Sequence, residues 1–283
     1  MRFPQKPSSR INALPAYVGQ NVDLAGMKWV AFFPDNVRQN RQRASAVIVL
    51  NSFETGYPIA VLDGTLISAA RTAASAALAA RSLIPSKLAR SFAFYGAGII
   101  NRDVLEFLLD DGWSLRNIQI NDPNSESQRA LAEHCHTRGC SNVETGKIED
   151  PTSHDLVSMA TSALTPWFDS DIGNHQTILH ISLRDILPKH LKAVRNIVDD
   201  VEHAVKANTS LHLLQQEAGS IPRIENLQNL LSVKATQTKE ATVVAAFGMG
   251  ILDIAVASFI MEMADKTNEL LELKGMLPSL SRW

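Results

Sequence analysis

The stretch from Ala89 to Cys135 constrains the fold more than any other part of the chain. It begins with the short apolar run SFAFY, turns at Gly96-Ala97-Gly98, and continues into RDVLEFLLDDG, whose apolar spacing is helical. A second short strand, NIQIND, follows and closes on an acid. Strand, glycine turn, helix and strand in this order predict a β-α-β unit with parallel strands.

Three later runs extend this pattern. HDLVSMATSAL (154–164), TILHISL (177–183) and NIVDD (196–200) are strand candidates followed by polar or turn residues. Strands that alternate with helices predict a parallel sheet. We expect this part of the chain to begin near Pro85 and to end near Lys234. We expect the final helices, after Lys234, to pack with the N-terminal part of the chain.

The N-terminal part has a different pattern. MKWVAFF (27–33) is β-rich, and SAVIVL and IAVL flank the turn Glu54-Thr55-Gly56-Tyr57-Pro58, which predicts an antiparallel hairpin and a small sheet. The alanine-rich run from Gly64 to Leu83 has no interior glycine or proline, so we expect a helix that packs closely on its small-residue face.

Composition narrows the class of protein. The chain has 283 residues, of which 45% are hydrophobic, and 27 Lys+Arg against 29 Asp+Glu, so a basic surface for nucleic acid is not expected. Two cysteines and an N-terminus without a signal-peptide pattern predict a cytoplasmic protein. The apolar segment from Ala241 to Ala264 carries Asp253 near its centre, which favours a buried core helix over a membrane span.

The glycine turn predicts a nucleotide site. Gly96 and Gly98 follow a strand and open a helix, where glycines let a pyrophosphate approach the helix N-terminus. Asn101 stands where the third glycine of a dinucleotide fingerprint belongs. Asp122, at the end of the next strand, is placed to accept hydrogen bonds from a ribose, and it favours NAD over NADP. The alternative is an ordinary glycine turn with an exposed acid.

Four isolated charged residues are ambiguous by themselves. Arg71 lies inside the alanine-rich helix, and Arg10 and Lys28 lie beside predicted strands, where such residues are more often surface charges than ligand-binding groups. Asp185 follows the run LHISL, close to the end of a parallel strand, where open sheets present groups to ligands.

Two further clusters have metal-binding residue types. The spacing of HCHTRGC (134–140) matches no zinc motif, so we interpret it as a solvated helix end. VDDVEH (198–203) is read as a charged turn after a strand, although its acids could suit a hard metal. We therefore expect no metal site. The sequence also lacks a GxSxG motif, so it does not indicate a nucleophilic serine.

Several motifs together resemble the ornithine cyclodeaminase/mu-crystallin family. They are Lys28-Trp29-Val30, Glu54 to Pro58, Asp63-Gly64-Thr65, Arg71 to Ala76, Gly96-Ala97-Gly98 and Gly248-Met249-Gly250. The resemblance covers nearly the whole chain. MKWVAFFPDN, RASAVIVLN, ISLRDILP and VDDVEHAVKANTS resemble most the branch that makes 2,3-diaminopropionate for siderophores and related peptides.

The resemblance implies an α/β fold with two domains. A Rossmann NAD-binding domain would span residues 85–234, and a smaller α+β substrate-binding and dimerisation domain would be formed by residues 1–84 and 235–283. Family members usually begin some tens of residues before the segment that contains Arg10, so the resemblance implies a poorly anchored Arg10.

The resemblance also assigns roles to residues. Arg10 and Arg71 match the family's carboxylate-binding arginines, and Lys28 and Asp185 match its catalytic lysine and aspartate. Gly96, Gly98 and Asp122 would hold the pyrophosphate and ribose of NAD, while Thr161 and Gly248 would approach its nicotinamide half. Which of Lys28 and Asp185 is the general base stays open.

The reaction implied by the branch is an NAD-dependent oxidation of N-(2-amino-2-carboxyethyl)-L-glutamate. Hydride loss gives an imine, and hydrolysis then gives 2,3-diaminopropionate and 2-oxoglutarate. Two alternatives are a redox-neutral lyase of the ornithine cyclodeaminase type and a non-catalytic NAD-dependent binding protein of the mu-crystallin type. A homodimer is expected from the family.

Overall fold

The computed structural model describes residues 1–39, 41–237, 239–273 and 275 of the chain. The protein forms two compact units. The first unit consists of Met1–Ser68 and Met249–Trp283, and the second consists of Ala69–Gly248. Each unit is described by itself below.

The first unit is built on an antiparallel sheet of five strands in sequential order. The predicted hairpin is confirmed, with Ile48 paired with Leu62 and Leu50 paired with Ala60 across its two strands. A short 3-10 helix, Pro34–Gln39, precedes the hairpin. The strands are β1 (Arg2–Phe3), β2 (Lys6–Val18), β3 (Leu24–Phe32), β4 (Ala44–Ser52) and β5 (Pro58–Asp63).

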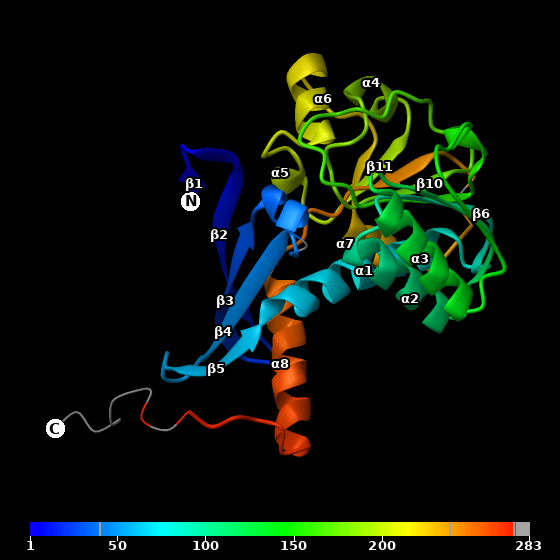
Figure 1. Ribbon diagram of the computed structural model, residues 1–283. Helices are drawn as coiled ribbons and strands as arrows, with labels where there is room; N and C mark the ends of the chain where they lie inside the picture. Colours follow the sequence, from blue (N-terminus) through cyan, green and yellow to red (C-terminus); the bar gives the residue numbers. More distant parts are fainter. Residues whose placement is uncertain (40, 238, 274, 276–283) are drawn as a thin grey trace. The chain divides into compact units, whose positions relative to one another are not determined.

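One face of this sheet packs against helix α8 (Gly250–Lys266), drawn in orange in Figure 1. Alternate residues of β4 point to this face, so Ile48 and Leu50 are fully buried against Ile254 and Ala257 of the helix. The apolar stripe of α8 and the inward face of the hairpin therefore form the core of the first unit.

Strand β2 was not anticipated, because its two prolines and its polar start are atypical of a long strand. Met1, Arg2 and Phe3 pair with residues of its first half, and Pro15 pairs with Met27 of β3. Arg10 pairs with Arg2 on one side and with Phe32 on the other. The expectation of a poorly anchored Arg10 is therefore wrong.

The second unit is built on a parallel sheet of eight strands in the order β12-β11-β13-β10-β9-β6-β7-β8. The sequence predicted the strands that contain SFAFY, NIQIND, LVSM, TILH and NIV. The strands are β6 (Leu88–Tyr95), β7 (Ser114–Asn121), β8 (Asn142–Thr145), β9 (Leu156–Met159), β10 (Thr177–His180), β11 (Arg195–Val198), β12 (Ile224–Asn226) and β13 (Thr242–Val244).

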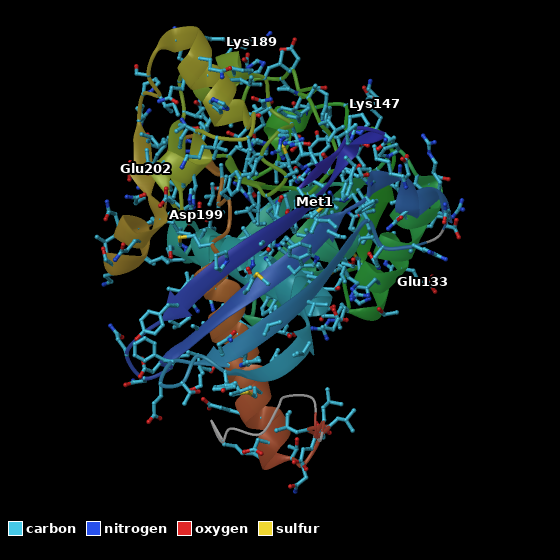
Figure 2. The ribbon with its side chains drawn as sticks, turned by 90° about the vertical axis from the view of Figure 1, so that its left-hand side faces the viewer. Met1, Glu133, Lys147, Lys189, Asp199 and Glu202 are labelled. Atoms are coloured by element: carbon cyan, nitrogen blue, oxygen red, sulfur yellow. The ribbon has the colours of Figure 1, made fainter. Side chains whose placement is uncertain are left out.

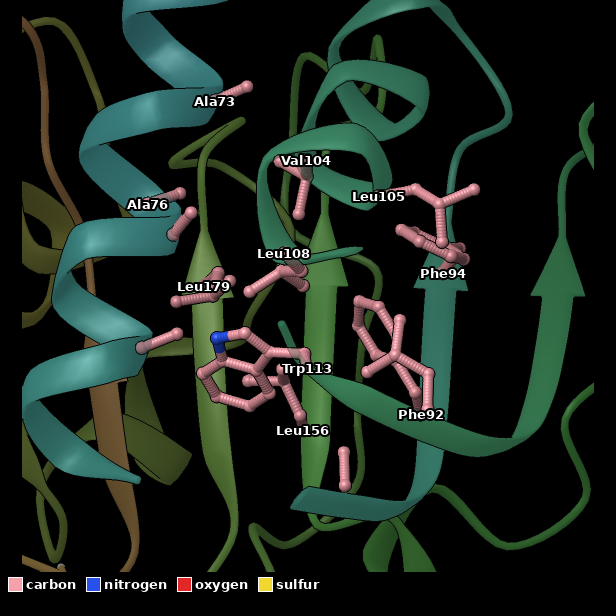
Figure 3. Close-up of a cluster of buried hydrophobic side chains, with 14 of the residues drawn as sticks. Ala73, Ala76, Phe92, Phe94, Val104, Leu105, Leu108, Trp113, Leu156 and Leu179 are labelled. Atoms are coloured by element: carbon pink, nitrogen blue, oxygen red, sulfur yellow. The ribbon is translucent and has the colours of Figure 1, made fainter. Parts of the chain in front are cut away.

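Helices cover both faces of this sheet. Phe92 and Phe94 of β6 belong to one buried cluster and Ala93 and Tyr95 to another, as expected for a strand whose side chains alternate between two covered faces. Figure 3 shows the first cluster, in which alanines of α1 and large side chains of α2 lie over the strands. The helices are α1 (Gly64–Leu83), α2 (Ile99–Asp110), α3 (Ser125–Thr137), α4 (Pro188–Leu191), α5 (Val201–Ala204), α6 (Ser210–Ala218) and α7 (Leu227–Ser232).

The limits of the units differ from the seams expected near Pro85 and Lys234. Most of α1 joins the second unit, because its alanines from Ala73 to Ala80 pack into that unit's core. The segment from Ala241 to Ala264 is also not one helix, since its first residues form β13 in the middle of the parallel sheet. The predicted fold class, a Rossmann-like α/β domain with a smaller α+β domain, is confirmed.

Candidate functional site

The strand order of the second unit reverses between β6 and β9. From β6 the chain continues to β7 on one side, whereas β9 is followed by β10 on the other side. Open parallel sheets bind ligands at such a point, outside the carboxyl ends of the strands. Gly96 and Gly98 follow β6 at this end of the sheet, and Thr161 follows β9 at the same end.

The two glycines of the turn have different environments. Gly96 is buried with a φ of +93°, and a Cβ there would overlap the carbonyl oxygen of Ala160. Gly98 is exposed and directly precedes α2, and a Cβ there would meet no atom within 4 Å. The fold therefore requires glycine at position 96, while Gly98 leaves an open face at the N-terminus of a helix of 12 residues.

Asp122 ties the end of β7 to this turn. One of its carboxylate oxygens accepts a hydrogen bond from the backbone N–H of Ala97 at 2.8 Å, and the other accepts one from Asn124 N–H at 2.8 Å. The carboxylate therefore lies beside the glycine turn. An open glycine face at a helix N-terminus, with an acid at the end of the next strand, fits the pyrophosphate and ribose of a dinucleotide.

Thr161 and Asp185 are brought together beyond the end of β9. The Thr161 hydroxyl and the Trp167 indole N–H, the latter at 3.0 Å, donate to one carboxylate oxygen of Asp185. The Ser182 hydroxyl donates to the other oxygen, and His180 Nε2 lies 3.2 Å from it. The carboxylate is fully buried and surrounded by four polar side chains.

These neighbours decide the charge of Asp185. Burial raises the pKa of its carboxyl, but the neighbouring imidazole of His180, with the hydroxyls of Ser182 and Thr161, outweighs burial and lowers the pKa to about 2. Asp185 is therefore an anion at neutral pH, and its oxygens organise the loops that carry Thr161 and Trp167.

Arg71 and Gly248 also meet within the second unit. The Arg71 guanidinium lies so close to Gly248 that a Cβ at position 248 would overlap its Nη1 atom. Asp199, which follows β11 next to α5 (Figure 2), accepts hydrogen bonds from the backbone N–H groups of Phe247 at 2.8 Å and Gly248 at 2.5 Å. The carboxylate of Asp199 thus holds the turn that faces Arg71.

The first unit buries an ion pair. Lys28 lies on β3 with 2% of its side chain exposed, and its Nζ lies 2.5 Å from Oδ2 of the fully buried Asp253 on α8. Nζ also donates to the Ser68 hydroxyl at 3.1 Å. A buried carboxylate without such a partner would be costly to the fold.

Arg10 lies in the same unit, on β2. Its guanidinium stacks over the ring of Phe32 at 4.4 Å from the centroid, and the guanidinium of Arg43 lies 5.7 Å from the same ring. A flat aromatic surface orients a guanidinium group.

The two clusters that resembled metal sites have other roles. Cys135 and Cys140 are buried in the core of the second unit, so the view of HCHTRGC as a solvated helix end was wrong for its cysteines. Asp200 caps α5 by accepting from His203 N–H at 2.8 Å. Among the described residues, no group of three or more His, Cys, Asp or Glu side chains is arranged to hold a metal ion, and no helix is long and apolar enough to cross a membrane.

Three site residues were not found from the sequence. Asp253 was noticed only as a charge in an apolar segment, and Asp199 only as part of an acidic run. Asn101 was treated as a departure from a glycine pattern. A buried acid in an apolar helix was a usable signal, because such a charge requires a partner.

Comparison with known proteins gives relatives over most of the chain. The chain is similar to the N-((2S)-2-amino-2-carboxyethyl)-L-glutamate dehydrogenase of Staphylococcus aureus, with 28% identity over 274 residues, which covers 92% of this chain and 81% of that protein. It is also similar to the alanine dehydrogenase of Archaeoglobus fulgidus, with 26% identity over 91% of this chain and 81% of that protein.

Solved structures share the fold. The Δ1-pyrroline-2-carboxylate reductase of Thermococcus litoralis, in complex with NADH and L-proline, has a TM-score of 0.84 at 20% identity, covering 95% of this chain and 86% of that one. An archaeal alanine dehydrogenase dimer with bound NAD has a TM-score of 0.77 at 21% identity, covering 95% and 89%. Residues 1–268 match the ornithine cyclodeaminase/mu-crystallin family, and the chain belongs to that family.

Proposed function

We propose that this protein is an NAD-dependent oxidoreductase that acts on a CH–NH bond of an amino-acid-derived substrate. The observation that carries the proposal is the turn at the reversal of strand order, where Gly96 is required by the fold and Gly98 is left open. The relatives support the same chemistry, because the names of both proteins describe dehydrogenases whose substrates are amino acids or amino-acid derivatives. NAD, when bound, supplies a hydride acceptor.

The proposed substrate is N-(2-amino-2-carboxyethyl)-L-glutamate, as for the relative from Staphylococcus aureus. The α-carbon of its glutamate part would lose a hydride, and the nitrogen its proton, to form a carbon–nitrogen double bond. Water would then add to that carbon, and cleavage of the C–N bond would release 2-oxoglutarate and 2,3-diaminopropionate. We place this activity in the cytoplasm and assign its product to siderophore or related peptide synthesis.

The side chains support distinct roles in this reaction. The substrate carries three carboxylates, for which we assign the guanidinium groups of Arg10 and Arg71. We assign proton exchange to Lys28, whose Nζ lies 2.5 Å from the Asp253 carboxylate. Asp185 is saturated by four neighbours, so we assign it the positioning of Thr161 and Trp167.

The reaction is tested by mixing purified protein with NAD and this substrate, and in parallel with ornithine. We expect NADH and 2-oxoglutarate in equal amounts from the first substrate and no reaction with the second. Proline and ammonia from ornithine without net NADH would instead show a cyclodeaminase. NAD binding without turnover of either substrate would show a binding protein of the mu-crystallin type.

The cofactor site is tested separately by a matched pair of glycine variants. Gly98→Ala adds a methyl group to open space, so it should leave the free energy of unfolding within about 1 kcal/mol of wild type but weaken NAD binding at least tenfold. Gly96→Ala should destabilise the fold by roughly 1–3 kcal/mol, because its backbone is left-handed and its Cβ overlaps Ala160. Unchanged NAD affinity in Gly98→Ala would refute the assignment of the pyrophosphate site.

We also propose a homodimer formed through the outer face of the five-stranded sheet. Trp29 and Val47 are paired neighbours on this face, and Val61 lies on the same face; these residues are 39%, 43% and 52% exposed. An antiparallel sheet with a free face normally carries polar residues there. Val47→Glu should convert a species of twice the monomer mass into monomer in light scattering, whereas an unchanged mass would exclude this face.

A further inference from the structure

Asn101 occupies the position at which a dinucleotide fingerprint has its third glycine, two residues into α2. It is fully buried, as is Ser158 on β9. A glycine at this position lets the helix pack closely against the strand. Here a polar side chain fills the space instead, so its hydrogen bonds must explain its presence.

The Asn101 amide is held at both ends. Its Nδ2 donates to the carbonyl oxygens of Tyr95 at 3.0 Å and Gly96 at 2.6 Å, and its Oδ1 accepts from the Ser158 hydroxyl at 2.7 Å. This arrangement fixes which end of the amide faces the turn, because carbonyls require a donor and the hydroxyl requires an acceptor. The side chain therefore joins the glycine turn to β9 at the reversal of strand order.

The peptide group between Gly96 and Ala97 is hydrogen-bonded by two different side chains. The carbonyl of Gly96 is bound by Asn101, and the N–H of the same peptide group, on Ala97, donates to Asp122 at 2.8 Å. The plane of this peptide determines where the chain goes next, which is Gly98 and its open face. The side chains of Asn101 and Asp122 thus fix the orientation of the peptide that precedes Gly98.

We propose that Asn101 is a positioning residue of the cofactor site, which locks the Gly96–Ala97 peptide so that Gly98 faces the pyrophosphate of NAD. This inference rests on the proposed function. It has a consequence opposite to what the fingerprint suggests: Asn101→Gly restores the third glycine, yet it removes the lock and weakens NAD binding.

The test compares NAD dissociation constants of the wild type, Asn101→Gly and Ser158→Ala, measured by titration calorimetry on protein shown to be folded. Asn101→Gly loses both hydrogen bonds to the turn, so its Kd should rise about tenfold or more. Ser158→Ala removes a buried hydrogen bond of the same network but leaves both bonds to the turn, so its Kd should stay within about twofold of wild type. KM for the amino-acid substrate should change in neither variant.

A second variant keeps the test decisive if glycine in the helix unfolds the chain. Asn101→Ala lacks the same amide but restores the helix propensity that glycine lacks, so it should fold better and still bind NAD about tenfold more weakly. NAD binding by Asn101→Gly or Asn101→Ala as tight as wild type would overturn the inference, and so would an equal loss in Ser158→Ala. A wild type that binds no NAD would instead overturn the proposed function itself.

Discussion

Two fully buried carboxylates, one in each unit, are stabilised in opposite ways. Asp253 of the first unit lies beside a cation, with Lys28 Nζ at 2.5 Å. Asp185 of the second unit is instead surrounded by two hydroxyls, an indole N–H and an imidazole. The first arrangement neutralises charge, and the second spreads it over several hydrogen bonds.

The two carboxylates should therefore differ in how strongly the loss of one neighbouring side chain affects them. Removal of Lys28 takes an ammonium group away from a buried carboxylate, whereas removal of one neighbour of Asp185 leaves three others in place. The first arrangement is appropriate for a group that exchanges protons, because a change of charge on one partner changes the electrostatic energy of the other. A group that orients loops suits the second.

The largest expected effect is that of Lys28→Met. It removes the ammonium group beside the buried Asp253 carboxylate, so the free energy of unfolding should fall by about 3–5 kcal/mol in urea denaturation. The double variant Lys28→Met/Asp253→Leu should recover most of that loss and stay inactive. A double variant no more stable than Lys28→Met would show that the pair is not the source of the loss.

The titration of Asp185 should have a smaller effect. Because its pKa in the folded protein is lowered to about 2, its contribution of about 2 kcal/mol is fully present above the ordinary pKa of an aspartate and is lost as the pH falls through about 2. Denaturation of the wild type and Asp185→Asn between pH 6 and pH 2 measures this. The difference in stability between the two should shrink by about that amount, and a constant difference would contradict the assigned pKa.

The smallest effect should come from one neighbour of Asp185. Thr161→Val removes one hydroxyl and leaves the other three partners of the carboxylate, so we expect a loss of about 1–2 kcal/mol in unfolding experiments. Ser182→Ala is the matched control on the other oxygen and should cost a similar amount. A loss as large as that of Lys28→Met would mean that Asp185 is as sensitive as Asp253.

Much of the fold could be predicted from local pattern. The hairpin before Asp63, the alanine-rich helix after it and the β-α-β unit around Gly96 all show periodicity or turn residues within a short window. Strand β13 could not be separated from the apolar helix that follows, because three residues are too few to show a period. Strand β2 was not predicted, because its two prolines are atypical of a long strand.

The site was less accessible to sequence reasoning. Gly96, Gly98 and Asp122 follow a local pattern and lie at one end of the parallel sheet, as expected. The partners Lys28 and Asp253 are far apart in the chain, and only the fold of the first unit brings them together. Asn101 was read as a missing glycine, because a pattern of residue types does not show the hydrogen bonds that replace it.

The central claim is oxidation at one carbon of the substrate, and isotope transfer tests it most directly. N-(2-amino-2-carboxyethyl)-L-glutamate that carries deuterium at the α-carbon of its glutamate part is incubated with the protein and NAD, and the NADH is examined by mass spectrometry. We predict one deuterium in each NADH formed, with 2-oxoglutarate and 2,3-diaminopropionate in equal amounts. Products that form without deuterated NADH would contradict the account.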